Sequence, residues 1–313
     1  MKRRIIKQGH STHTITLPAK WIKKYNFNAG DEIEMLEQGR NLIISSDKDY
    51  ASSCAKVNIT DLPKFLIEHY LLAIYRNGVD EIELHFNKPL TRDLKKKKNV
   101  KILSTIQKKV NELIGVEIIR HTDQSCLIKQ LSEISENEFN NVLRRIFLLL
   151  TDLSKETLQN IKKKNYEGLS NVEVKYKTIN KFVNFCLRLL NKRGHRNYKK
   201  TSLSYHLISE LDLIAEVYEY ISLEIAREQW ILDPKAILVL EDVNKSLHLL
   251  YELVFKFDNK KVIEILKLRR KIFDNINTQS KKLKTENIIV FNRLSLIVVT
   301  IMHSAETQAS MQL

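Results

Sequence analysis

The hydrophobic pattern of the first 47 residues is that of short strands and one short helix. Apolar and polar residues alternate over residues 2–17 around a turn at Gly9, which is the period of a half-buried sheet. Pro18 ends this pattern and suits the first turn of a helix, so residues 19–25 are predicted to be helical. Further strands are expected over 32–36 and 41–44. The predicted order is strand, strand, helix, strand, strand.

Residues 48–136 carry a mixed pattern that predicts a small α/β domain. A helix is expected over 65–76, and strands are expected over 55–59, 81–86, 115–119 and 126–131. A basic run is expected to open a second helix that continues to Leu113; it comprises Arg92, Lys95, Lys96, Lys97, Lys98 and Lys101. The preferred interpretation of the four adjacent lysines is a solvated loop and helix start, although cations are unfavourable at a helix N-terminus. The alternative is a second phosphate-contacting patch or a site for an anionic regulator.

From residue 137 to 313 the pattern becomes helical throughout. Apolar residues recur at intervals of three and four, which is typical of helices that face a core. These stripes predict six helices, over 139–153, 179–190, 207–225, 240–257, 262–276 and 291–305. Six antiparallel helices with short connections favour two three-helix bundles.

Charge is segregated within the first 47 residues. Seven cations precede the first acidic residue, Asp31, and the second half of the segment is acidic. A one-sided basic surface of this kind is expected to contact phosphates, whereas the alternative is a solvated face on a lysine-rich protein. The candidate DNA-binding residues are Lys2, Arg3, Arg4, Lys7, His10, Ser11, Thr12, His13, Lys20, Lys23 and Lys24. His10 and His13 flank the first turn, where they either contact DNA or are simply exposed.

Two short motifs carry a resemblance to a known family. Gly9-His10-Ser11-Thr12-x-x-Ile15-Thr16-Leu17-Pro18-x-x-Trp21, followed by Asn28-Ala29-Gly30-Asp31-Glu32-Ile33, resembles the AbrB/SpoVT/MazE swapped-hairpin module. The form S-T-x-x-I-T-L-P-x-x-W most resembles the version fused to PhoU-type helical domains in archaeal proteins. The resemblance implies an obligate dimer that binds double-stranded DNA, and 47 residues are also too few to bury much core alone.

The same resemblance implies a multidomain, mainly α fold. It divides the chain into a swapped-hairpin β domain (1–47), the small α/β domain (48–136) and a PhoU-like pair of three-helix bundles (137–313). It also implies a role in the regulation of phosphate uptake.

PhoU domains carry acidic pairs that hold metal ions, and this pattern is eroded here. Tyr176 and Asn180 stand where one pair is expected, and Ser295 and Val299 where another is. In the third helix Asp212 and Glu216 keep two carboxylates four residues apart, which places both on one helix face, with Glu219 beyond them. The preferred interpretation of Asp212 and Glu216 is two solvated acids on a helix, and the alternative is a remnant cation site. Weak metal binding or none is expected, and no cofactor.

The composition indicates what kind of partner the protein binds and in which cellular compartment it is expected. A net charge of +15 favours an anionic partner, either nucleic acid or an anionic membrane surface. Cys54, Cys126 and Cys186 lack the spacing of a zinc site or a disulfide framework, and the longest apolar run, Leu294 to Met302, is too short for a membrane span. A cytoplasmic protein is expected.

A second basic cluster lies at 194–200 and is preceded by Arg188, Lys192 and Arg193. Either it binds phosphate or RNA, or its positive charges interact favourably with the dipole at the C-terminal end of a helix.

Two classes of function remain open. In the first, the chain is a DNA-binding regulator whose helical part senses phosphate status through a partner. In the second, the helical part is the working part, restraining a phosphate transporter or its signalling kinase, and the N-terminal domain serves to dimerise. An antitoxin is a weaker third possibility, since antitoxins usually carry a disordered tail. No catalytic motif occurs, so an enzyme is not expected.

Overall fold

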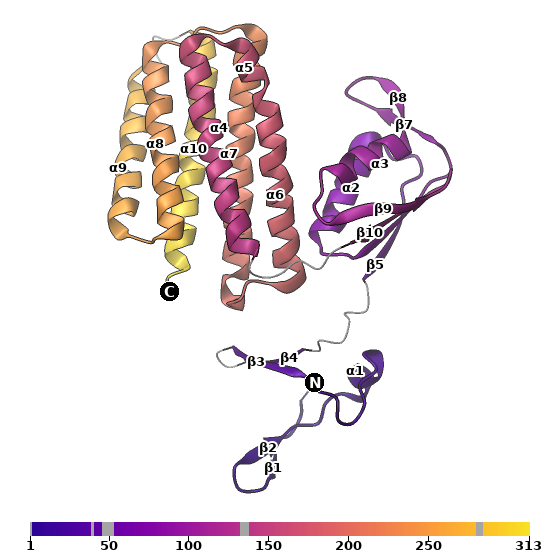
Figure 1. Cartoon of the computed structure of the whole chain (residues 1–313). Coiled ribbons are helices and arrows are strands. Elements are labelled where there is room, and N and C mark those ends of the chain that lie inside the picture. Colours follow the sequence, from indigo (N-terminus) through magenta and orange to yellow (C-terminus); the bar gives the residue numbers. More distant parts are fainter. Residues whose placement is uncertain (1, 39–40, 46–52, 132–137, 280–283) are drawn as a thin grey trace. The chain divides into compact units, whose positions relative to one another are not determined.

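The chain divides into two compact units. The computed structural model describes residues 2–38, 41–45, 53–131, 138–279 and 284–313. One unit comprises Met1–Cys54 and the other Ala55–Leu313 (Figure 1). The multidomain, mainly α fold predicted from the sequence is confirmed. The division into three domains stays a prediction, because its boundaries at 47/48 and 136/137 both lie outside the described residues.

The N-terminal unit has the predicted order of two strands, a helix and two strands. Its elements are β1 (Ile6–Gln8), β2 (Thr12–Thr14), α1 (Ala19–Lys24), β3 (Glu34–Gln38) and β4 (Asn41–Ser45). Strands β1 and β2 form an antiparallel hairpin whose turn uses a positive φ of 82° at Gly9, a conformation that favours glycine. The carbonyl of Pro18 accepts from the amides of Trp21 and Ile22 and so starts α1. Strands β3 and β4 form a second antiparallel hairpin.

The first part of the second unit is a four-stranded sheet covered by two helices. The sheet has the order β5-β6-β10-β9, with β10 antiparallel to both neighbours. The bounds are β5 (Cys54–Asn58), α2 (Lys64–Arg76), β6 (Glu81–His85), α3 (Ile102–Asn111), β9 (Val116–His121) and β10 (Ser125–Gln130). Ile82 and Leu84 on β6 alternate with more exposed residues and join Ile67 and Leu71 of α2 and Ile106 of α3 in one core. The predicted strands and the first predicted helix are all present.

The basic run does not start a helix as predicted. It lies on a hairpin formed by β7 (Leu90–Asp93) and β8 (Lys98–Lys101), and α3 begins after it, at Ile102. Thr91 and Asp93 are buried on the inner side of β7. Lysine has good helix propensity, but hydrogen bonds made by the buried side chains of Thr91 and Asp93 hold this segment extended. The prediction overlooked the alternation of exposed and buried positions from Leu90 to Asp93.

The rest of the second unit contains the six long helices predicted. They are α4 (Glu138–Lys163), α6 (Val172–Arg193), α7 (Thr201–Glu228), α8 (Pro234–Phe255), α9 (Asn259–Gln279) and α10 (Thr285–Ser310). The short helices α5 (Tyr166–Ser170) and η1 (Tyr198–Lys200) fill two of the connections. Helices α4, α6 and α7 pack on one another, as do α8, α9 and α10, and contacts of α7 with α10 and of α4 with α8 join the two groups. All six share one continuous apolar core.

Helix α10 is long and carries a long apolar stretch. Within the part of the chain that the structure describes, it alone is long and apolar enough to cross a membrane. A core helix meets the same test, and α10 contributes Phe291, Leu294, Ile297 and Ile301 to the helical core. Its apolar character is therefore explained by packing.

A buried arginine joins the sheet and the helical part. Arg188 of α6 is 1% exposed and donates to the carbonyls of Tyr75 (2.7 Å) and Val79 (2.8 Å) and to Oε1 of Gln130 (2.6 Å). Its guanidinium also lies over the Tyr75 ring, 4.8 Å from the centroid. Gly78 packs tightly against the same helix, since a Cβ there would lie 2.8 Å from Cβ of Lys192.

Candidate nucleic-acid interface

The β1–β2 hairpin carries polar side chains that the register assigns to two faces. Lys7 lies directly opposite His13, and Gln8 opposite Thr12. Because opposed residues of an antiparallel pair point to the same face, Lys7 and His13 share one side of the hairpin. His10 and Ser11 lie in the exposed turn.

Helix α1 carries basic side chains beside an aromatic cluster, and Nζ of Lys24 lies over the Tyr25 ring, 5.1 Å from its centroid. Lys23 and Lys24 follow Lys20 by three and four residues, so both lie one turn beyond it on the same side of the helix. The Trp21 ring stacks on Phe27 with centroids 4.9 Å apart and contacts the Tyr25 ring at 5.6 Å. This aromatic contact anchors the short helix, so that its lysines are held at the surface.

All the candidate DNA-binding residues are exposed. Among the residues described, no ion pair joins Lys2, Arg3, Arg4, Lys7 or the lysines of α1 to a carboxylate. The structure thus brings the candidates together in two groups, one on the first hairpin and the strand entry, and one on α1. Unpaired, exposed cations are what contact with phosphates requires.

The N-terminal unit also exposes apolar side chains. Ile5 is 70% exposed, Met35 63% and Leu42 54%, and Ile6 and Ile15 are exposed as well. Among its described residues, Phe27 is the one buried hydrophobic side chain. The described residues of this unit therefore leave apolar surface uncovered, which is typical of an interaction surface.

The predicted acidic pair on α7 is engaged by the protein's own side chains. Oδ1 of Asp212 accepts from Asn180 at 2.9 Å, and a guanidinium nitrogen of Arg76 lies 3.9 Å from its other oxygen. Glu216 accepts from the Tyr220 hydroxyl at 2.7 Å. Burial raises the pKa of Asp212, which shows that its charged form is poorly solvated. The described residues contain no group of three or more His, Cys, Asp or Glu side chains placed to hold a metal ion.

The second basic cluster predicted from the sequence is divided by the fold. Arg188 is buried and Lys192 pairs with Asp80, so these two cations serve the contact with the sheet and are not available to phosphate or RNA. Arg193, His195 and Arg196 instead line a pocket of about 410 Å³ beside Phe139 and Leu189.

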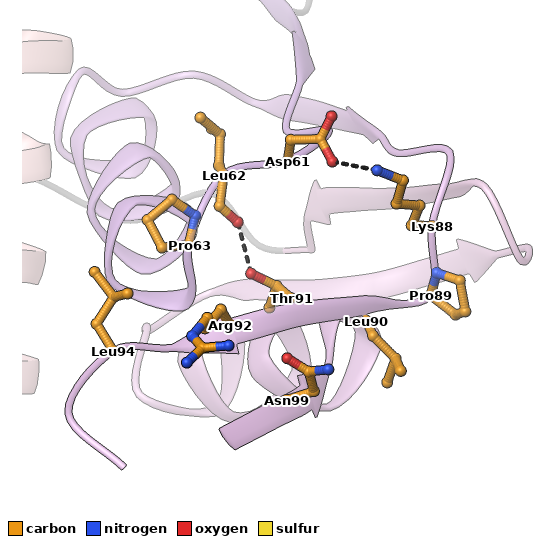
Figure 2. A pocket seen from close by; sticks show the side chains of 10 residues that line it. All are labelled: Asp61, Leu62, Pro63, Lys88, Pro89, Leu90, Thr91, Arg92, Leu94 and Asn99. Atoms are coloured by element: carbon orange, nitrogen blue, oxygen red, sulfur yellow. Dashed lines mark hydrogen bonds and ion pairs between the residues drawn. The ribbon is translucent and has the colours of Figure 1, made fainter. Parts of the chain in front are cut away.

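A larger pocket, of about 650 Å³, lies beside the β7–β8 hairpin (Figure 2). Its walls come from the segment before α2, with Asp61 and Pro63, and from β7, with Leu90 and Arg92. Asp61 accepts a hydrogen bond from Lys88 at 2.7 Å. The sequence pattern did not indicate this pocket, because the basic run was expected to start a helix.

Comparison with known proteins supports the assignment of the N-terminal unit. Residues 6–51 match the model of a family described as antidote-toxin recognition MazE, bacterial antitoxin. No curated protein and no solved structure matched the chain. The N-terminal unit is therefore of the MazE/AbrB type, which supports a DNA-binding or antitoxin-like regulator. The predicted likeness of the helical part to PhoU stays a prediction.

Proposed function

We propose that this protein is a dimeric, DNA-binding transcriptional regulator. The observation that carries the proposal is the N-terminal unit, which matches the MazE model and presents exposed, unpaired cations next to uncovered apolar side chains. In the proposed complex the apolar side chains lie between two protomers. Arg3, Arg4, Lys7 and the lysines of α1 then neutralise phosphates.

The finer part of the proposal concerns the signal. By its resemblance to PhoU, the helical part is proposed to report phosphate status through a protein partner, so that the regulated process is phosphate uptake. The six helices, arranged as two groups of three around one core, support this role. The proposal includes a cytoplasmic location and neither enzymatic activity nor a cofactor, and the engaged state of Asp212 and Glu216 disfavours a metal-dependent role.

A second candidate function is restraint of a phosphate transporter or its signalling kinase by the helical part. The exposed apolar side chains of the N-terminal unit favour it, because they support dimerisation whether or not DNA binds. An antitoxin remains the weaker third possibility.

Fluorescence anisotropy of labelled duplex DNA tests the proposal. The probes are the region upstream of the protein's own gene and a random duplex of equal length, titrated over a range of salt concentrations. We expect Arg3→Ala, Arg4→Ala and Lys7→Ala together to weaken binding at least about tenfold and to lower the log-log salt slope by about 2 to 3. A matched control, Lys235→Ala, Lys256→Ala and Lys260→Ala, removes the same charge from exposed positions on and near α8 and α9.

The two functions give different results in this experiment. Tighter binding to the upstream region than to the random duplex, lost in the N-terminal variant and kept in the control, is expected of a regulator. Weak binding that is equal for both duplexes and unchanged in the N-terminal variant would contradict the proposal and favour the transporter or kinase role.

A further inference from the structure

The β7–β8 hairpin is the most densely basic segment of the second unit. Residues 88–101 contain seven basic residues and one acid, Asp93. That acid does not neutralise the lysines of the turn, because it is buried and its Oδ2 pairs with Lys64 of α2 at 3.2 Å. The exposed surface of the hairpin is therefore strongly positive.

The hairpin is held in a fixed position on the sheet-and-helix part. The Thr91 hydroxyl donates to the carbonyl of Leu62 at 2.6 Å (Figure 2), and the amide of Ile102 donates to the carbonyl of Pro89 at 2.9 Å. In the turn, Oδ1 of Asp93 accepts from the Lys96 amide at 3.0 Å, and this hydrogen bond is the main cause of a lowered pKa of Asp93. A cationic turn fixed in this way loses little conformational entropy when it binds an anion.

The cations of the hairpin differ in their surroundings. Lys95 borders a pocket formed with Glu224 and Arg227 of α7, so it faces the helical part. Lys96, Lys97 and Lys98 are exposed, and within the described part of the chain no carboxylate pairs with them. Arg92 and Lys101 are exposed on the strands beside them. The surface that remains available is the turn of a two-stranded ribbon, with Lys98 on one face of the ribbon and Arg92 and Lys101 on the other.

We propose that the β7–β8 hairpin contacts the sugar-phosphate backbone of the same DNA duplex that the N-terminal unit binds. This inference rests on the proposed function. Eight residues separate the end of β4 from the start of β5, so the chain between them spans at most about 30 Å. A duplex held by the N-terminal unit is thus present near the second unit at a high effective concentration. This tether favours DNA over a membrane surface or an RNA.

The contact adds affinity without adding sequence information, because phosphates are the same at every base pair. In a dimer it is made twice. The protein is then expected to bind with more phosphate contacts than its N-terminal unit alone supplies.

The test uses the full chain with Lys96→Gln, Lys97→Asn and Lys98→Gln together. Asparagine is chosen at 97 because Lys97 has a φ of 52°, a conformation that asparagine tolerates. The matched control is Lys235→Gln, Lys256→Gln and Lys260→Gln, and thermal unfolding by circular dichroism checks that each variant is folded. Anisotropy is measured against both duplexes over the same salt series. We expect the hairpin variant to lose about fivefold to fiftyfold in affinity, equally for both duplexes, and its salt slope to fall by about 2 or more.

Each other outcome has a distinct meaning. An unchanged salt slope in the hairpin variant, while the N-terminal variant still loses binding, would overturn this proposal and leave the proposed function standing. Unchanged binding in both variants would overturn the proposed function as well. Unchanged DNA binding combined with lost binding to phosphatidylserine vesicles, or to a single-stranded RNA, would assign the hairpin to that other class of partner.

Discussion

The two units of this chain treat their apolar side chains in opposite ways. The N-terminal unit exposes Met35 and Leu42 by more than half, whereas the second unit buries its helical stripes in one continuous core. The second unit therefore has an apolar core of its own, while the first presents an apolar surface that the proposed dimer would cover. From this difference we expect the proposed dimerisation to depend on the N-terminal unit and the folding of the second unit to be independent of it.

Within the second unit, the contact between sheet and helices is polar at its centre. Arg188 has three hydrogen-bond acceptors and a ring beside it, and Arg76 donates to Oδ1 of Asn184 at 2.7 Å. Phe185 and Leu189 pack with Ile114 at its edge. A buried cation with fitted acceptors makes this contact specific in position, so the sheet and the helical part behave as one body.

The largest effect expected is from breaking this buried contact. Arg188→Met keeps much of the volume and removes the donor to the carbonyls of Tyr75 and Val79, of which Tyr75 still accepts from the Gly78 amide. We expect the free energy of unfolding of the second unit to fall by about 3 to 5 kcal/mol. Urea unfolding followed by far-ultraviolet circular dichroism measures it. Arg193→Met, at an exposed position of the same helix, should change it by less than about 0.5 kcal/mol. A loss below about 1 kcal/mol for Arg188→Met would show that the contact is not a determinant of stability.

The next effect is on the N-terminal unit. Leu42→Asp places a charge among apolar side chains that the proposed dimer covers, and removing that charge from water is costly. We expect the dimer dissociation constant to rise about a hundredfold, as measured by light scattering coupled to size exclusion. Leu238→Asp on α8, also exposed, is the control and should leave the dimer intact. A dimer that survives Leu42→Asp would place the dimer contact elsewhere in the chain.

Sequence reasoning succeeded where a single period dominated. The stripes of three and four residues located all six long helices, and alternation with Gly9 and Pro18 located the N-terminal elements. It failed at the β7–β8 hairpin because four adjacent lysines show no period. There the extended backbone is fixed by the contacts of Thr91 and Asp93 with residues about thirty positions away.

The candidate site was predictable in part for the same reason. The exposure of the N-terminal cations was predictable because they lie close together in the sequence, while their role in binding DNA stays a prediction. Arg188 and Lys192 looked equivalent to their exposed neighbours in a basic cluster, and the fold buried one and paired the other with Asp80. Pairing with distant residues leaves no signal in a local pattern.

The smallest effect expected concerns Glu219 of α7. Its titration should make the stability of the second unit depend on pH, without an effect on the N-terminal unit. This carboxyl is 8% exposed, and burial, with Glu173 and Glu216 nearby, raises its pKa from 4.5 to about 7. Lys177 and Lys95 oppose this shift. Because the raised pKa means that the folded state prefers the protonated form, Glu219 stabilises the second unit below pH 4.5. That stabilisation is lost as the pH rises through 7.

Glu219→Gln mimics the protonated form at every pH. We expect it to raise the free energy of unfolding at pH 8 by about 1 kcal/mol and to flatten its decline between pH 5 and 8. Glu264→Gln, at an exposed position on α9, should leave the pH profile of the parent unchanged. The dimer dissociation constant should be the same in both variants as in the parent, because Glu219 lies outside the N-terminal unit. If Glu219→Gln instead altered dimerisation, folding of the second unit and dimerisation of the first would be coupled, and the separation between them would fail.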